Sequence, residues 1–521
     1  MKFAMKSGIL LCLSVLAVCQ TVRAQDISLD GPGAQTLTPL SPDGIPYSDP
    51  IPVRRWSASQ AKVALPASVD NSLLKYFPPV IDQLGGSCAQ ASYIGYMFTY
   101  EVNRLLDRDA SLPENRFSYL YTWNFINGGK DEGSIGTDGL ALALQNGVIT
   151  ESDFPRQYSG TQFYWASGYQ KYFNGMHYRT ESFEQIEVKD QAGIETVKRY
   201  LFDKNTPGGP GGIVTFSSRA GEWKFDNSYS GPSETGYTCL LTQLSPTGAH
   251  AMTIVGYDDL VEFNAPDQTV SKGAFIVANT YSTAFHDKGR FYLPYWFFLQ
   301  KRDGSDLSNT VTGLTVKYFD PLIVFRVSLD YTSRDDIAFN IGVSGNTSDK
   351  VPVHDYGVSI AENQGGDYPM RGRYSSSDIE FGFDFSSHVD KMEGMDEANF
   401  FLTVKRDRRG EIIGTGKLLS FSVYDYRQDR DNPKVYVCND IDGSELEFGK
   451  NIYNVTTVPP PQASCSQVEW LNPQTKEPVS APLVIRTARG RYAKIRLSGY
   501  DRESGTIRLK YVYNPNGSRN F

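Results

Sequence analysis

The sequence predicts an α+β region followed by an all-β region. Helical and strand patterns alternate from Leu65 to about Leu322, and only short strand patterns follow. Composition agrees, because 47 glycines, 32 tyrosines and 29 phenylalanines suit β-rich domains with many turns. A chain of 521 residues is too long for one ordinary domain, so we expect two or three.

The first 24 residues are typical of a secretory signal peptide. Lys2 and Lys6 give a basic start, residues 8–18 a short apolar run, and Val22-Arg23-Ala24 a cleavage site. We therefore expect a secreted, periplasmic or cell-surface protein, with lipid attachment at Cys19 as the alternative. The apolar run is too short to span a bilayer, and no later run reaches about 18 apolar residues. No transmembrane segment is expected.

Residues 25–62 are rich in Pro, Gly, Ser, Thr and Asp and show little apolar periodicity. This composition predicts an extended leader or linker, or a short propeptide. Arg54-Arg55 within it is either a processing point or a solvated charge pair.

Residues 63–322 carry the mixed α and β patterns. A helix with one buried face is expected from Cys88 to about Leu106, because Ala91, Ile94, Phe98 and Val102 recur there at helical spacing. A second helix is expected from Gly139 to Gln145, ending at Asn146-Gly147. The expected strands are Gly212–Phe216, His250–Tyr257, Gly273–Asn279 and Gly289–Leu293.

The C-terminal half shows strand patterns only. Short strand runs between charged or glycine-containing turns predict a β-sandwich over residues 323–458. A hinge at Pro459-Pro460-Pro461 precedes residues 459–521, which form either a continuation or a small third domain. The sandwich is expected to help fold, dock or target the preceding region, with contact to a cell surface or a glycan as one use. His354 and His388 have no partner at metal-ligand spacing, so we expect no metal and no cofactor.

Charge and cysteines narrow the function. A net charge of −8 argues against nucleic-acid binding, which needs a basic face. Four cysteines remain after signal removal, and export permits disulfides. Cys438 and Cys465 are the plausible disulfide pair, and Cys239 is interpreted as a residue that only packs in the core. Cys88 is then left as a thiol that is either buried or reactive.

Three segments carry candidate chemistry. Cys88 follows Gln83 by five residues at the start of the expected helix, where backbone N–H groups favour a thiolate. His250 lies 162 residues further on, and Asn279 a further 29. An imidazole beside the thiol supplies the cation of a thiolate–imidazolium pair, and an amide oxygen holds its ring in one orientation. The Gln83 amide beside the Cys88 N–H can stabilise an oxyanion.

Each residue alone also fits a purely structural role. A cysteine at a helix start is usually only buried, a histidine in a strand is usually a core residue, and an asparagine usually ends a strand or makes a turn. The combination of Cys88, His250 and Asn279 in one order is what favours catalysis.

These motifs resemble those of the papain-like cysteine peptidases, in particular divergent bacterial members. The matching segments are Leu65–Asp70, Pro79–Cys88, Asp131–Ser134, Gly248–Tyr257 and Ala274–Asn279 with Gly289–Tyr292. The resemblance implies a two-lobed catalytic domain, with a helical lobe and a β-barrel-like lobe, over residues 63–322. It also implies that the Gly133 backbone pairs with a substrate peptide and that Ser134 lies near the pocket for the P2 side chain. The Cys-to-His spacing in this family is about 130–150, so modest insertions are required.

The chain departs from the family pattern at four points. The aromatic that usually follows the nucleophile is Ala89, and the tryptophan two residues past the asparagine is Tyr281. The Gln-to-Cys loop is one residue shorter than usual, and the cysteine three residues before the nucleophile is Gly85, so the nearby disulfide of the family is absent. These changes keep the reacting groups and call the shielding of the His–Asn contact into question.

The predicted function is hydrolysis of peptide bonds in a protein or peptide substrate by an exported cysteine peptidase. One alternative is a catalytically weak papain-like protein used for binding or adhesion. A streptopain-like peptidase and an acyl transferase that acts on amines are the others.

Overall fold

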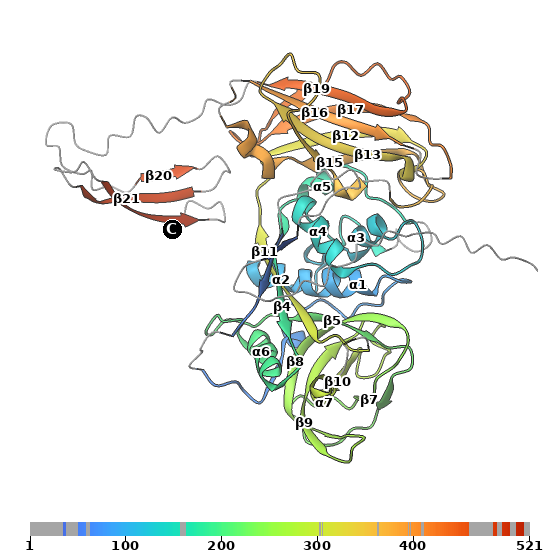
Figure 1. The fold of residues 1–521 in the computed structure, drawn as a ribbon, viewed down its shortest axis with the longest axis vertical. Helices are drawn as coiled ribbons and strands as arrows, with labels where there is room; N and C mark the ends of the chain where they lie inside the picture. The colour runs from blue at the N-terminus through green and yellow to red at the C-terminus, as the bar shows by residue number, and fades with distance from the viewer. Residues whose placement is uncertain are drawn as a thin grey trace, which may run out of the picture. The chain divides into compact units, whose positions relative to one another are not determined.

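The computed structural model describes residues 35–37, 51–58, 63–156, 163–301, 304, 306–361, 364–393, 395, 397–407, 411–457, 483–486, 492–500 and 507–514. The predicted signal peptide and Cys465 lie outside these residues. An α+β region comes first and is followed by two antiparallel four-stranded sheets, as the sequence predicts (Figure 1).

The first region contains several short helices, and one of them begins at the candidate nucleophile Cys88. They are η1 (Asn71–Leu73), α1 (Cys88–Gln90), η2 (Ala91–Phe98), α2 (Thr99–Leu106), η3 (Pro113–Asn115), α3 (Tyr119–Ile126), α4 (Gly136–Asn146), α5 (Tyr169–Gly175), α6 (Gln191–Phe202) and α7 (Trp296–Leu299). The expected helix from Cys88 to Leu106 is thus one continuous helical run, and the expected second helix is α4. Gly147 ends α4 with a φ of +71°, a left-handed angle that glycine adopts without strain.

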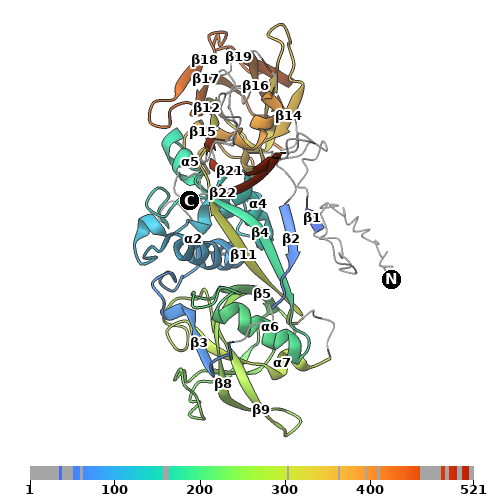
Figure 2. The ribbon, with the colours of Figure 1, turned by 90° about the vertical axis from the view of Figure 1, so that its left-hand side faces the viewer.

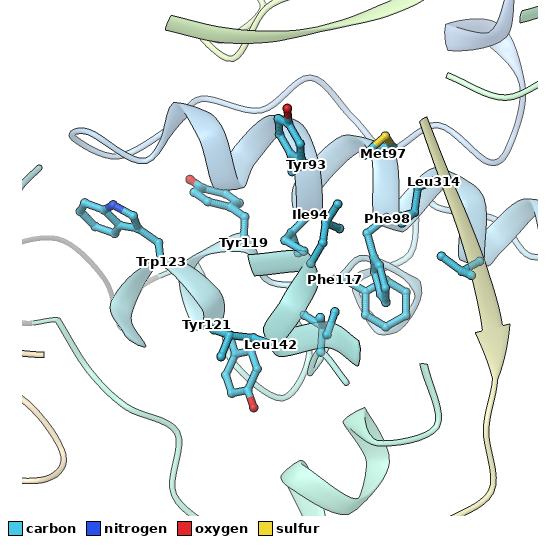
Figure 3. Packing of buried hydrophobic residues seen from close by; sticks show 14 of the residues in the cluster. Tyr93, Ile94, Met97, Phe98, Phe117, Tyr119, Tyr121, Trp123, Leu142 and Leu314 are labelled. Atoms are coloured by element: carbon cyan, nitrogen blue, oxygen red, sulfur yellow. The ribbon is translucent and has the colours of Figure 1, made fainter. Parts of the chain in front are cut away.

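The run through η2 is buried on every side, whereas the sequence predicts one buried face. Ile94 and Phe98 are fully buried as expected, but so are Tyr96 and Met97. Figure 3 shows Phe98 beside Phe117, and their rings meet edge to face at 5.0 Å. A helix apolar all round belongs inside a core. Cys88 therefore opens a helix that is held rigidly by its surroundings.

One large mixed sheet forms the rest of the first region. Its strands are β1 (Gln35–Leu37), β2 (Ile51–Arg55), β3 (Ser68–Asp70), β4 (Tyr178–Glu187), β5 (Val214–Arg219), β6 (Lys224–Asp226), β7 (Leu240–Gln243), β8 (Ala249–Asn264), β9 (Val270–Ala278), β10 (Arg290–Pro294) and β11 (Thr310–Tyr318). Their order is β1-β2-β4-β11-β5-β8-β9-β10-β7-β6, with β3 paired to β8. Figure 2 shows β4 and β11 side by side, in agreement with their antiparallel register. The four expected strands are β5, β8, β9 and β10.

The expected leader takes part in this sheet. Strand β2 pairs in parallel with β4, with Val53 opposite Phe183, and β1 pairs with β2. The Trp56 N–H donates to the Gln185 carbonyl at 3.0 Å, and its ring meets that of Tyr200 at 5.0 Å. Strand β2 therefore lies inside the sheet, between β1 at the edge and β4, which composition alone did not suggest.

Two antiparallel sheets make up the sandwich. One has the order β15-β12-β17-β18 and the other β14-β13-β16-β19. The elements are β12 (Ile323–Tyr331), η5 (Arg334–Asp336), β13 (Ile337–Ser344), β14 (His354–Gly357), η6 (Ser359–Ala361), β15 (Asp378–Asp384), η7 (Ser386–Met392), β16 (Ala398–Arg406), β17 (Gly416–Asp425), β18 (Lys434–Val437) and β19 (Gly449–Thr457). Phe325 and Phe400 from opposite sheets meet at 5.7 Å, which marks the core between them. Strands β20 (Leu483–Arg486), β21 (Tyr492–Tyr500) and β22 (Ile507–Asn514) form a separate three-stranded sheet.

The sandwich and the helical region share buried polar contacts. The Arg179 guanidinium pairs with Asp384 at 2.7 Å, and both side chains are 1% exposed. Glu380 in β15 accepts a hydrogen bond from the Tyr169 N–H at 2.6 Å. Because these contacts exclude water, the sandwich is part of the same packed structure as α4 and α5.

Cys438 is buried and free in the described part of the chain, and its expected partner Cys465 lies outside the described residues, so their pairing stays a prediction. Cys239 is also free and buried, as its reading as a packing residue requires. No helix in the described part of the chain is long and apolar enough to cross a bilayer.

Candidate active site

The candidate nucleophile lies at the first residue of α1. Cys88 is a free, partly exposed cysteine. Helix α1 packs against β8, which carries His250. One turn further along the helical run, the buried Ser92 hydroxyl donates to the Ala251 carbonyl at 2.9 Å. This bond ties the nucleophile helix to the residue that follows the candidate base.

His250 and Asn279 are in direct contact. The His250 Nε2 lies 2.8 Å from the Asn279 Oδ1. The Thr280 backbone N–H donates to the same Oδ1 at 2.7 Å. Because a backbone N–H can only donate, it fixes the amide with its oxygen toward the ring. Nε2 is therefore the protonated nitrogen, and Nδ1 is the one left for chemistry.

Tyr281 covers this pair. Its ring stacks on the His250 ring with centroids 4.6 Å apart and planes 15° apart. Burial raises the pKa of Tyr281, and the nearby charge of the Cys88 thiolate adds to the rise. The Tyr281 ring therefore lies directly against the imidazole. An aromatic cover over the His–Asn contact is present although the family's tryptophan is not.

Burial determines the charge of the imidazole. His250 is 5% exposed, and burial lowers its pKa, while the hydrogen bond to Asn279 acts in the opposite direction. The ring is therefore mostly neutral at neutral pH and can accept a proton from a thiol.

Gln83 lies beside the same strand end. Its backbone N–H donates to the Thr280 carbonyl at 2.8 Å, and the Thr280 hydroxyl donates to the Gln83 Oε1. The Gln83 Nε2 donates to the Gly85 carbonyl at 2.8 Å. An amide nitrogen carries two hydrogens, so a second remains for an oxyanion. The Thr280 hydroxyl thus fixes the orientation of the Gln83 amide.

Gly133 and Ser134 lie next to the nucleophile segment. Gly133 is exposed, and a Cβ added there would meet nothing within 4 Å, so open space lies on its side-chain side. The Ser134 hydroxyl accepts a hydrogen bond from the Gln90 Nε2 at 3.2 Å. Gln90 lies two residues after Cys88, so this segment contacts the nucleophile helix directly.

Sequence reasoning missed two residues that hold the site. Thr280 is fully buried and contacts both Asn279 and Gln83. The Tyr96 hydroxyl donates to the Asn279 carbonyl at 2.8 Å and accepts from the Ile81 N–H at 2.8 Å. The position of Thr280 directly after the asparagine is a signal that was available. Nothing in the sequence around Tyr96 indicates a contact 183 residues away.

Two cavities of about 240 and 340 Å³ occur in the described part of the molecule, and none of the six predicted site residues lines either. The first is lined by Trp165, Lys171 and Arg371 among others, and the second by Trp56, Arg104 and Lys204 among others.

Similarity to known proteins is found among solved structures. A scan against models of protein families finds no match, and a search of curated proteins finds none either. Among solved structures, the chain is similar to xylellain, a cysteine protease from Xylella fastidiosa. The match has 20% identity and a TM-score of 0.35 and covers 50% of this chain and 91% of the other.

Two further solved structures give the same picture. Procathepsin B from Trypanosoma congolense has 13% identity and a TM-score of 0.34, covering 51% and 83% of the two chains. The cysteine protease CMS1MS2 from Carica candamarcensis, in complex with E-64, has 14% identity and a TM-score of 0.32, covering 48% and 99%. About half of the chain thus resembles papain-like cysteine proteases. All three TM-scores lie below 0.5, so the assignment of the site rests on the contacts above.

Proposed function

We propose that this chain is an exported cysteine peptidase that uses Cys88 as its nucleophile and His250 as its base. The observation that carries the proposal is the 2.8 Å contact between the His250 Nε2 and the Asn279 Oδ1. The Tyr281 ring stacks on His250, and the strand that carries His250 is hydrogen-bonded to the nucleophile helix. The His250 ring is buried and oriented on a strand that packs against the helix of the partly exposed Cys88 thiol, which supports nucleophilic catalysis by cysteine.

The first half of the reaction forms an acyl-enzyme. His250 takes the thiol proton on Nδ1, and the Cys88 sulfur attacks the substrate carbonyl carbon. The carbonyl π electrons move to the oxygen, where the Gln83 amide and the Cys88 N–H stabilise the charge. Collapse of this intermediate breaks the C–N bond, and the His250 proton goes to the departing amine.

The second half releases the acid. Water gives a proton to His250 and attacks the thioester carbon. Collapse expels the Cys88 thiolate and leaves a carboxylic acid. Asn279 keeps the ring in one orientation through both halves because its oxygen holds the Nε2 proton. This role requires no change in the protonation of Asn279.

The proposed substrate is a protein or peptide in extended form. Gly133 supports this, since its exposed backbone next to the nucleophile segment suits pairing with a peptide strand. Buried contacts such as Arg179–Asp384 favour a structural role for the sandwich over contact with a cell surface or glycan.

A peptide epoxide that alkylates thiols tests the proposal together with a fluorogenic peptide panel. We expect the wild type to be labelled once, at Cys88, and to cleave peptides. Cys88→Ala should remove both signals, and His250→Ala should reduce both by at least about 100-fold. Cys239 and Cys438 are buried internal controls that should stay unlabelled in the folded protein.

Other outcomes would favour the alternatives. Labelling of Cys88 without cleavage of any peptide would contradict the peptidase and support a binding protein. Incorporation of an added amine into an acceptor protein would support acyl transfer. Cleavage by the wild type would leave the choice between papain-like and streptopain-like relatives unaffected, since both use the same pair.

A further inference from the structure

The loop before the nucleophile lies unusually close to the segment that carries Gly133. Gly85 has a φ of +52°, and a Cβ added there would lie 1.9 Å from the Asp131 Oδ1. A Cβ added at Gly86 would lie 2.6 Å from the Glu132 carbonyl carbon. Real side-chain carbons do not approach other atoms so closely, so both positions require glycine for this contact.

A carboxylate bridges the two segments. The Gly86 backbone N–H donates to the Asp131 Oδ1 at 2.7 Å. A hydrogen bond to an ionised acceptor is shorter and stronger than one between neutral groups. Gly86 lies two residues before Cys88, and Asp131 lies two residues before Gly133. The bond therefore links the loop that leads to the nucleophile with the expected substrate-binding backbone.

A second, buried set of hydrogen bonds joins the same two segments on the other side of Cys88. The Gln90 Nε2 donates to the Ile135 carbonyl at 2.9 Å and to the Ser134 hydroxyl. The Thr122 hydroxyl holds the Gln90 Oε1 at 3.0 Å. Gln90 is fully buried, whereas Asp131 is exposed. Residues 131–135 are thus tied to the nucleophile segment on both sides of Cys88, by an exposed carboxylate at one end and by a buried amide at the other.

We infer that Asp131 is a positioning residue for the proposed peptidase reaction. It holds the Gly85–Gly86 loop so that the Cys88 N–H points at the developing oxyanion, at a fixed separation from the Gly133 backbone. In the family that this chain resembles, a cysteine at the position of Gly85 belongs to a nearby disulfide. Here a carboxylate hydrogen bond joins that loop to its neighbour instead. The inference rests on the proposed function.

Steady-state kinetics of three full-length variants test the inference. In Asp131→Asn the side chain keeps an acceptor oxygen, so we expect kcat within about threefold of wild type. Asp131→Ala removes the acceptor, and we expect kcat to fall about tenfold with KM changed less than threefold. Glu132→Ala is the matched control, because it removes the same charge from the next exposed side chain. It should leave kcat unchanged.

The possible results distinguish a failure of this positioning role from a failure of the proposed peptidase function. A wild type that neither cleaves peptides nor reacts at Cys88 would refute the proposed function. With an active wild type, Asp131→Ala at wild-type kcat would overturn the positioning role. Equal losses in the Asn and Ala variants, or in Glu132→Ala, would also overturn it, since charge rather than a hydrogen bond would then be responsible. Unchanged thermal unfolding of Asp131→Ala, with its kcat reduced, would support it over a purely structural role.

Discussion

Replacing Asp384 by asparagine should destabilise the α+β region and the sandwich together. The Arg179 guanidinium is 1% exposed and donates to the carbonyls of Met176, Leu144 and Gln145 as well as to Asp384. Burial lowers the pKa of Arg179, and the Asp384 charge opposes this shift. Asp384→Asn keeps the shape of the side chain and leaves the buried cation without its counter-charge.

The expected cost follows from the burial of the pair. Removing one partner of a buried ion pair costs about 3–5 kcal/mol. Three carbonyl acceptors remain, and asparagine can still accept a hydrogen bond, so the lower end, about 3 kcal/mol, applies. For a cooperative unit of about 400 residues, an unfolding entropy of about 2.1 cal/mol/K per residue converts this to a Tm decrease of about 4 °C.

Thermal unfolding followed by far-UV circular dichroism and by tryptophan fluorescence measures the effect. We expect one transition, shifted equally in both signals. Glu262→Gln is the matched control, because its pair with Lys272 is exposed and should contribute less than about 0.5 kcal/mol. A shift of under 1 °C for Asp384→Asn, or a shift confined to one of two separate transitions, would refute the reasoning.

Two further changes test other parts of the structure. Thr280→Ala removes the hydroxyl that orients the Gln83 amide but keeps the backbone bond to Asn279, so kcat should fall about tenfold while Cys88 alkylation changes little; an unchanged kcat would count against the role of Gln83. Burial lowers the pKa of His388 to about 4, and Asp390 only partly opposes this. Because the unfolded chain then binds the proton first, stability should fall as the pH drops from about 6.5 toward 4, by about 2 kcal/mol at pH 5. Urea unfolding of His388→Gln should lack this contribution, and an identical pH dependence in both proteins would contradict it.

Local patterns in the sequence were sufficient for the helix and the strands that carry the candidate site. The helix that begins at Cys88 and the strand that carries His250 each follow from apolar spacing and a glycine boundary. The pairing of β2 with β4 was not predictable in this way, because it joins residues 130 positions apart and one partner has a leader-like composition.

The site was predictable as a set of residue types but not as a set of contacts. Each of Cys88, His250 and Asn279 stands in a recognisable local segment, and the structure brings His250 and Asn279 within hydrogen-bonding distance. The residues that hold them, such as Thr280 and Tyr96, act through single hydroxyl groups. A tyrosine buried in an apolar helix looks like any other core residue until its hydroxyl is seen to donate to the Asn279 carbonyl.

The departures from the family pattern bear on whether the site is active. Two of them have physical substitutes: the Tyr281 ring stacks on His250 where a tryptophan is usual, and the Asp131 carboxylate contacts the loop at Gly85 where a disulfide is usual. Tyr281 itself is 43% exposed, but His250 and Asn279 beneath it are only 5% and 1% exposed. Their hydrogen bond is therefore shielded from water, and the local dielectric that would weaken it stays low. We therefore expect the change from tryptophan to Tyr281 to leave the orientation of the imidazole intact, which favours the proposed peptidase over an inactive binding protein.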